Sequence, residues 1–163
     1  MKTLFKNNKV CYLLFLCFLI SGAIAIVRTD QFQLHIWFNG FVGSKPLDTF
    51  FKYITYLGDG LFLVILAVLL FFLNFKNGLF LLISYAFSGG FTQFMKEVFF
   101  DDVNRPFFYR SYYGLKINIV EDVQMYIHNS FPSGHSTSAF CLFFCLSYMV
   151  RPVWAKLALF IVG

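Results

Sequence analysis

The stretch from Val10 to Val27 reads VCYLLFLCFLISGAIAIV and carries no charged side chain. As a helix rising about 1.5 Å per residue it spans about 27 Å, close to the thickness of the hydrocarbon core of a bilayer. Lys2, Lys6 and Lys9 precede it, and a basic segment before an apolar one is typical of a signal anchor or of a signal peptide. Ala23-Ile24-Ala25 resembles a processing site, but the apolar run is longer than that of an ordinary signal peptide. We therefore expect an uncleaved membrane span.

The composition of the whole chain agrees with a membrane protein. Of 163 residues, 59% are hydrophobic, 13% are charged and 25 are phenylalanine, whereas soluble domains have about 45–50% apolar and about 25% charged residues. A water-soluble domain of this length could not bury so many aromatic rings in one core. The net charge of +5 does not indicate nucleic-acid binding, because the basic residues form no stripe on a polar surface. All four cysteines lie inside apolar runs, so we expect small buried side chains and neither disulfides nor a metal site.

Four further apolar segments continue the pattern. They cover residues 61–75, 79–95, 136–150 and 153–163. The polar triplet Lys76-Asn77-Gly78 is expected to form the turn between the first two of these segments. From Leu47 to Leu57, apolar residues recur at helical spacing with Asp48 and Lys52 between them, which predicts an amphipathic helix in the membrane interface. The expected fold class is all-α: a polytopic transmembrane helical bundle in which five spans begin, with an interfacial amphipathic helix.

The last apolar run ends at Gly163, after eleven residues that rise only about 16 Å as a helix. A terminal carboxylate at that depth would lie in hydrocarbon, where an unpaired charge is costly. From the sequence we therefore expect residues 1–163 to be a fragment, or a natural truncation, of a single transmembrane domain.

The charged residues predict the orientation of the bundle. If the spans alternate, one side of the membrane carries basic residues in short segments and no acid. These residues are Lys2, Lys6, Lys9, Lys76, Arg151 and Lys156. The other side carries all eight acids and seven basic residues in longer loops. Basic residues concentrated in short loops mark the cytoplasmic face, so the long loops are expected outside.

The residues that could act chemically lie where a loop meets the helix expected from Ser136 onward. This stretch reads Phe131-Pro132-Ser133-Gly134-His135. A helix N-terminus offers free backbone N–H groups and the positive end of the helix dipole, which together bind anions. Ser133 adds a hydroxyl, Gly134 allows close approach of a ligand, and His135 can exchange a proton near neutral pH. The structural alternative is that Ser133 only caps the helix and His135 only lies in the interface.

Two cations upstream belong to the same side of the membrane. Lys96 and Arg105 can both bind phosphoryl oxygens, and Arg105 can do so through two hydrogen bonds. The alternative is that both side chains only reach toward lipid head groups. Ser88, Thr92 and Lys96 follow one another at four-residue spacing, which predicts a small, polar helix face that packs against other helices.

These residues resemble two motifs of a known family. Lys96 with Arg105-Pro106, followed by Pro132-Ser133-Gly134-His135, is similar to the first two motifs of the membrane-bound type 2 phosphatidic acid phosphatases, called PAP2. The Leu57-Gly58-Asp59-Gly60 stretch also resembles family members. The resemblance as a whole covers most of the chain, from about Leu47 onward. It implies six spans in the complete fold. It also implies one domain, covering residues 1–163 here and breaking off before the third motif.

The resemblance further implies an activity and a site. The activity is hydrolysis of a phosphate monoester or pyrophosphate of a membrane lipid at the outer face, through a phospho-histidine intermediate. His135 is implied to be catalytic, as the proton donor to the leaving group. Lys96, Arg105, Ser133 and Gly134 are implied to bind the phosphate, and the chemistry needs neither a metal nor another cofactor. The partners are then the lipid phosphate and the bilayer, with no nucleic acid. The implied location is a bacterial inner membrane, with the site facing the periplasm.

The sequence departs from the family pattern in two ways. Eight residues, Glu97 to Asn104, separate the lysine from the Arg-Pro pair, where the family usually has six. Nine helical steps of about 100° would place Arg105 on the face opposite Lys96, so we expect a break around Asp101 to Asn104. The third motif, which holds the attacking histidine in family members, is not found in residues 1–163.

Two other functions stay open from the sequence. One is a membrane module that binds anionic lipid head groups without turnover. The other is a transporter that recognises an anion at a helix end, which is less favoured because the polar residues lie at the boundary of the spans and not at their middle. The oligomeric state and the identity of the lipid do not follow from the sequence.

Overall fold

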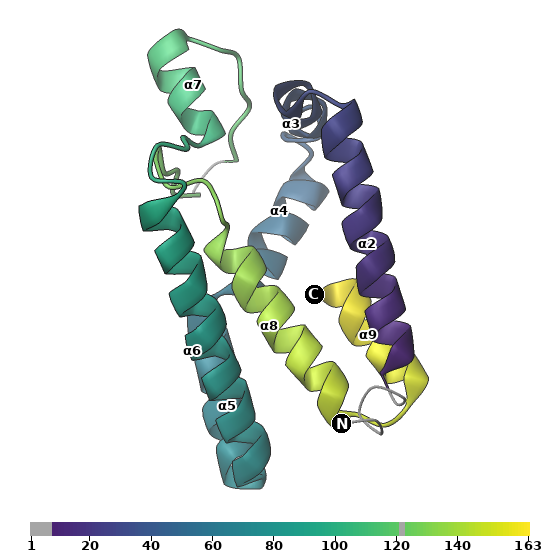
Figure 1. The fold of residues 1–163 in the computed structure, drawn as a ribbon. Coiled ribbons are helices and arrows are strands. Elements are labelled where there is room, and N and C mark those ends of the chain that lie inside the picture. The colour runs from purple at the N-terminus through teal and green to yellow at the C-terminus, as the bar shows by residue number, and fades with distance from the viewer. Residues whose placement is uncertain (1–7, 121–122) are drawn as a thin grey trace.

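A computed structural model describes residues 8–120 and 123–163 (Figure 1). Lys2, Lys6, Glu121 and Asp122, which entered the charge count, lie outside the described residues. Within the described ranges the chain forms helices and connections and no strand. The elements in order are α2 (Lys9–Arg28), α3 (Gln31–Asn39), α4 (Lys45–Ile54), the short 3₁₀ helix η1 (Thr55–Gly58), α5 (Gly60–Leu73), α6 (Phe75–Val98), α7 (Pro106–Tyr113), α8 (Gly134–Met149) and α9 (Val153–Val162).

The all-α fold is confirmed, and the number of membrane spans is smaller than predicted. Among the described residues, α2 and α6 are each long and apolar enough to cross a membrane. A third span results if α4 with η1 and α5 are taken as one element, bent by 51°. The helices α8 and α9 contain 16 and 10 residues, which is short for a complete span of about 20 residues. The structure thus supports two or three spans, and five are not confirmed.

The core of the bundle lies between α5, α6 and α8. Its buried residues are Leu63, Ala67, Leu81, Leu142 and Cys145. A glycine sets the closest approach within this core, because a Cβ atom on Gly78 would lie 2.4 Å from the backbone of Phe71. The α5–α6 hairpin can therefore close tightly only with a residue that lacks a side chain at position 78.

The turn of this hairpin is shifted from its predicted place. Lys76-Asn77-Gly78 was expected to be the turn, but these residues form the first helical turn of α6. The chain reverses at Asn74, whose backbone is extended and whose side chain accepts a hydrogen bond from the N–H of Asn77. Asparagine is a favoured helix N-cap, so capping at residue 74 prevails over the turn tendency of the polar triplet.

The helices α4 and η1 cover the stretch that was predicted to be an interfacial amphipathic helix, and that prediction is not confirmed. The backbone bends at Asp59, whose carboxylate accepts a hydrogen bond of 2.8 Å from the N–H of Leu61 and so caps α5. Since α4, η1 and α5 together also pass as one bent span, α4 can equally be the outer part of a membrane-spanning element.

The first helix, α2, packs against the rest of the bundle mainly through aromatic rings. Tyr12 and Phe15 contact Phe140 and Phe144 of α8, with ring centroids 5.8 to 6.2 Å apart. Most other side chains of α2 are exposed and apolar, as expected of a surface that faces lipid. The prediction that all cysteines are buried is wrong for Cys17, which is exposed on this helix, whereas Cys11 is buried.

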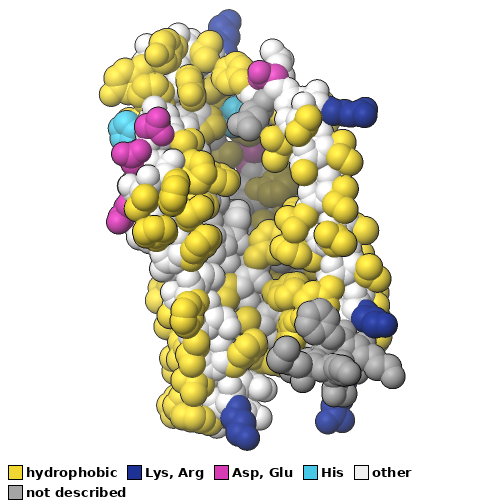
Figure 2. Space-filling model, viewed as in Figure 1, with side chains coloured by type: hydrophobic (Ala, Val, Ile, Leu, Met, Phe, Trp, Pro, Cys, Tyr) yellow, Lys and Arg dark blue, Asp and Glu magenta, His cyan; other side chains and the backbone are white. Residues whose placement is uncertain are grey.

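The charges are distributed unevenly along the bundle. Figure 1 shows that the start of α2, the α5–α6 turn and the α8–α9 connection lie at one end, and they carry Lys9, Lys76 and Arg151. Lys156 of α9 is buried, and its ammonium group donates a hydrogen bond to the Asn8 side chain. In Figure 2 the acidic side chains appear only in the opposite half of the molecule. This separation agrees with the charge pattern expected from the sequence.

The α5–α6 hairpin provides a test of the fold. Gly78→Ala is expected to destabilise the protein by about 1–3 kcal/mol, because the added methyl group must push α5 and α6 apart. Thermal unfolding in detergent, followed by circular dichroism, measures the effect. Gly90→Ala in the same helix is the matched control, since a Cβ there meets nothing within 4 Å. Equal unfolding temperatures for the two variants would contradict the close approach.

Candidate functional site

The two cations of the first motif are separated by a break in the chain, as predicted. Helix α6 ends at Val98, a turn follows at Asp101 and Asp102, and α7 begins only at Pro106. Arg105 precedes α7 in an extended conformation, with φ −79° and ψ 158°. The residue before a proline is disfavoured in helical conformation, which accounts for the position of the break.

The second motif forms the N-terminus of α8. Ser133 is the cap residue, and its hydroxyl accepts a hydrogen bond of 3.3 Å from the N–H of Ser136. One turn further, the Thr137 hydroxyl donates to the carbonyl of Ser133 at 2.9 Å and also lies 3.0 Å from the Thr92 hydroxyl of α6. These contacts hold the start of α8 against α6. They also confirm that Thr92 faces a neighbouring helix.

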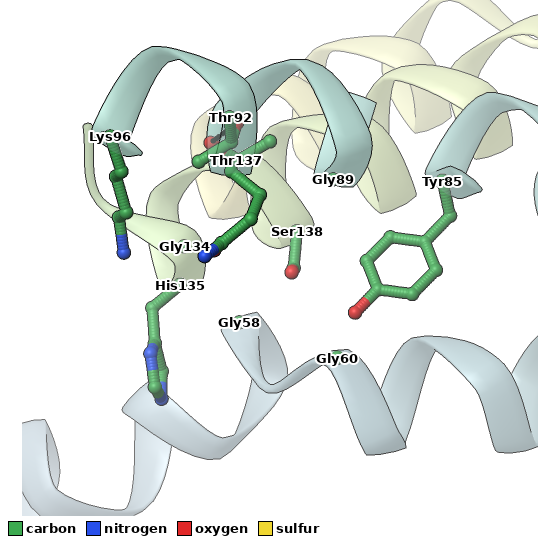
Figure 3. A pocket seen from close by; sticks show the side chains of 11 residues that line it. Gly58, Gly60, Tyr85, Gly89, Thr92, Lys96, Gly134, His135, Thr137 and Ser138 are labelled. Carbon is green, nitrogen blue, oxygen red and sulfur yellow. Dashed lines mark hydrogen bonds between the residues drawn. The ribbon is translucent and has the colours of Figure 1, made fainter. Parts of the chain in front are cut away.

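A cavity of about 260 Å³ lies where α6, α8 and the η1–α5 junction meet (Figure 3). Its lining residues are Gly58, Gly60, Tyr85, Gly89, Thr92, Gln93, Lys96, Gly134, His135, Thr137 and Ser138. The cavity thus includes residues of both motifs and of the Leu57–Gly60 stretch. It has room for several water molecules or for a small polar group.

One end of the cavity has a positive character. Lys96 is partly buried, and no carboxylate among the described residues forms an ion pair with it. Gly134 and His135 stand at the N-terminus of α8, where the helix dipole is positive and the first N–H groups have no intrahelical partner. Figure 3 shows the Lys96 and His135 side chains on the same side of the cavity. This end is suited to bind an anion.

Three of the five predicted site residues therefore line one cavity: Lys96, Gly134 and His135. Ser133 lies just outside the lining and acts as the helix cap. Gly134 has open space around its Cβ position, so a side chain there would extend into the cavity. Ser133 thus has the helix-capping role that was the alternative to phosphate binding.

Arg105 does not line the cavity. Its Nε donates a hydrogen bond of 3.0 Å to the carbonyl of His128, and one of its terminal nitrogens donates to the carbonyl of Asn129 at 3.4 Å. The guanidinium carbon also lies 5.4 Å from the centre of the Tyr126 ring. Arg105 thus holds the segment that leads into the second motif, and these partners, more than 20 residues away along the chain, have no local sequence signal.

Gly58, Gly60 and Tyr85 line the cavity but were not predicted as site residues, although the Leu57–Gly60 stretch resembles family members. Gly58 lets η1 approach α8, because a Cβ there would lie 2.8 Å from the carbonyl oxygen of His135. Gly60 makes room for the hydroxyl of Tyr85, which lies 2.0 Å from the place of its missing Cβ. The sequence did contain a signal for part of the wall, since Gly89, Thr92, Gln93 and Lys96 recur at helical spacing. The glycine contacts depend on tertiary packing and have no local signal.

The arrangement is that of an all-α protein with long apolar helices and a cavity that has a lysine, a histidine and a helix N-terminus at one end. A family model described as the PAP2 superfamily matches residues 77–163, which is more than half of the chain. No curated protein and no solved structure matches the sequence. The match covers α6 to α9, and it includes both Lys96 and the Pro132–His135 motif.

The chain belongs to the PAP2 superfamily, as its motifs predicted. Membership implies, in general terms, a hydrolase of the phosphatase type. The apolar helices α2 and α6 are consistent with a membrane protein.

The contact between Gly58 and α8 provides a test of the site. Gly58→Ala is expected to displace the backbone of His135 and to weaken binding of inorganic phosphate or vanadate at least several-fold. Isothermal titration in detergent measures the affinity. Gly22→Ala in α2, where a Cβ meets nothing within 4 Å, is the control and should bind like the wild type. Unchanged affinity in a folded Gly58→Ala variant would show that this contact does not shape the site.

Proposed function

We propose that the protein is a lipid phosphatase that hydrolyses a phosphate monoester or pyrophosphate of a membrane lipid at the outer membrane face. The observation that carries the proposal is the joint presence of Lys96, Gly134 and His135 in one cavity. A cation without an acidic partner, a helix N-terminus and an imidazole together can bind a phosphoryl group and transfer a proton to its leaving group.

The phosphoryl group would bind at the positive end of the cavity. No described residue accepts a hydrogen bond from the N–H groups of Gly134 and His135, so both remain available to phosphoryl oxygens. Lys96 adds a full positive charge close by. In the transition state of phosphoryl transfer, negative charge spreads over these oxygens, and fixed donors of this kind stabilise it.

His135 would act as the general acid. Its side chain is exposed at the cavity, where it can reach the oxygen that links the phosphoryl group to the lipid. Protonation of that oxygen lets the lipid leave as an alcohol, or as a monophosphate if the substrate is a pyrophosphate. As the family resemblance implies, a second histidine would take the phosphoryl group and water would release it. That histidine belongs to the third motif, which residues 1–163 do not contain.

We assign supporting roles to Arg105 and Ser133. A guanidinium has five N–H donors, and Arg105 uses two of its nitrogens on the carbonyls of His128 and Asn129. Its other N–H donors stay available, but the guanidinium does not line the cavity, so its role here is to hold the loop that leads into the second motif. Ser133 fixes the first turn of α8 through its cap, and in this way it keeps the N–H groups of Gly134 and His135 directed at the anion.

The charge pattern supports the proposed membrane face. The cavity lies away from the end that carries Lys76 and Arg151 (Figure 1). Basic residues in short connections mark the cytoplasmic side, which leaves the cavity toward the outer side. In a bacterium this corresponds to the inner membrane with the site open to the periplasm.

The second candidate is a module that binds anionic lipid head groups without turnover. It is favoured by the position of Arg105, which is bound to backbone carbonyls and not directed into the cavity. The two functions share the cavity. They differ in whether phosphate is released after the lipid binds.

The first test measures phosphate release from lipid phosphates in detergent, using the protein expressed from its native gene with any residues that follow Gly163. His135→Ala is expected to lower kcat by about 10² or more, because the leaving group loses its proton donor. Lys96→Ala is expected to lower kcat/KM by about 10²–10³. The exposed Lys116→Ala serves as the control and should retain full activity. Wild-type turnover in both site variants would refute the catalytic assignment, and binding without any release would favour the second candidate.

The second test concerns metal ions. Among the described residues, no group of three His, Cys, Asp or Glu side chains is placed to hold a metal. We expect phosphate release to be unchanged after dialysis against EDTA, because Lys96 and the N-terminus of α8 supply the positive charge. Loss of activity that Mg²⁺ or Zn²⁺ restores would contradict a metal-independent mechanism.

A further inference from the structure

The end of the cavity opposite Lys96 has a different chemistry. It is lined by Tyr85 of α6, Ser138 of α8 and Gly60 at the start of α5 (Figure 3). Ser138 is 6% exposed, and no described residue forms a hydrogen bond with its hydroxyl or with that of Tyr85. Figure 3 shows both hydroxyls directed into the cavity. Two hydroxyl groups thus stand without a protein partner at this end, one on the buried Ser138 and one on the half-buried Tyr85.

This inner end lies deep in the bundle. Tyr85 precedes Lys96 by eleven residues on α6, so it stands about 16 Å further along the helix axis. Gly89, between them, has no side chain to block the passage. The cavity is therefore longer than a phosphoryl group, and it extends from the charged end toward the apolar interior.

The inner end offers hydrogen bonds but no charge. Apart from Lys96 and His135, the residues that line the cavity are uncharged. A second phosphoryl group placed beside Tyr85 and Ser138 would lose its hydration without meeting a cation, which is costly. A hydrocarbon or isoprenoid chain placed there would leave both hydroxyls unpaired, which also costs free energy.

Uncharged oxygen atoms avoid both costs. They need no cation, and they accept hydrogen bonds from the two hydroxyls. The ester carbonyls and glycerol oxygens of a glycerolipid follow directly after its phosphate, and each accepts a hydrogen bond without carrying a charge. We propose that Tyr85 and Ser138 form a second subsite that binds these oxygens, so that the site selects a glycerolipid phosphate over a polyprenyl phosphate or diphosphate. The proposal rests on the proposed phosphate site and adds two specificity-determining residues to it.

Gly60 also bears on the proposed subsite, because it lies beside the Tyr85 hydroxyl. A Cβ at position 60 would lie 2.0 Å from the Tyr85 hydroxyl, so any larger residue must displace that hydroxyl from the cavity. Gly60→Ala therefore removes the same hydrogen bond as Tyr85→Phe, although it leaves the tyrosine in place.

The test measures binding with 163-residue protein in detergent by isothermal titration. The ligands are dihexanoyl glycerol phosphate, decyl phosphate, farnesyl phosphate and farnesyl diphosphate. Wild-type protein should bind the glycerol compound most tightly. Tyr85→Phe and Ser138→Ala should each lower the ratio of its affinity to that of decyl phosphate by about three- to tenfold. Gly60→Ala should lower this ratio in the same direction. Tyr53→Phe, on the exposed face of α4, is the control and should leave the ratio unchanged.

The outcomes separate this subsite from the phosphate site. An unchanged affinity ratio in Tyr85→Phe and Ser138→Ala, or tighter binding of farnesyl diphosphate by the wild type, would overturn the subsite. Failure of the wild type to bind any of the four phosphates, or binding that Lys96→Ala leaves unchanged, would instead refute the phosphate site, and the subsite with it. Phosphate release by the native gene product, assayed in parallel, reports on turnover alone and does not decide the subsite.

Discussion

The site depends on one hydrogen-bonded link between two helices. Thr92 of α6 and Thr137 of α8 join their hydroxyls at 3.0 Å, and Thr137 also bonds to the carbonyl of the cap residue Ser133. Thr92 lies one turn before Lys96, and Thr137 lies two residues after His135. This link therefore fixes the distance between the cation and the helix N-terminus. Thr92 is buried, and a hydrogen bond at a buried position is stronger and more costly to lose than one at a wet surface.

Two close glycine contacts also determine how the helices pack. Gly78 allows α5 and α6 to close, and Gly58 allows η1 to lie against the first turn of α8. Each position meets backbone atoms and not only flexible side chains, so the tolerance for a larger residue is small. The cavity thus has the η1–α5 junction on one side and the α6–α8 contact on the other. Such a rigid frame suits a site that must hold a phosphoryl group in a fixed orientation.

The sequence predicted the features that have local causes. The apolar run of α2, the cap at Ser133 and the break before Pro106 follow from composition, capping preference and proline geometry. The features that were missed or misplaced depend on competition or on distant partners. Asn74 prevailed over Lys76-Asn77-Gly78 as the turn, and five spans were expected from apolar runs of which two or three meet the length of a membrane span. Tyr85, Gly58 and Gly60 enter the cavity through contacts between segments far apart in the chain, which no local pattern reveals.

The hydrogen bonds of Arg105 have a thermodynamic consequence. The guanidinium donates to the carbonyls of His128 and Asn129, and an anion that drew it toward the cavity would compete with these carbonyls. If the anion takes the guanidinium, the loop before α8 loses two of its restraints. By linkage, a change that stabilises the ordered loop must weaken the binding of the anion to Arg105 by the same free energy. Filling the cavity would in that case loosen residues 126–130, the reverse of the ordering that ligands usually confer.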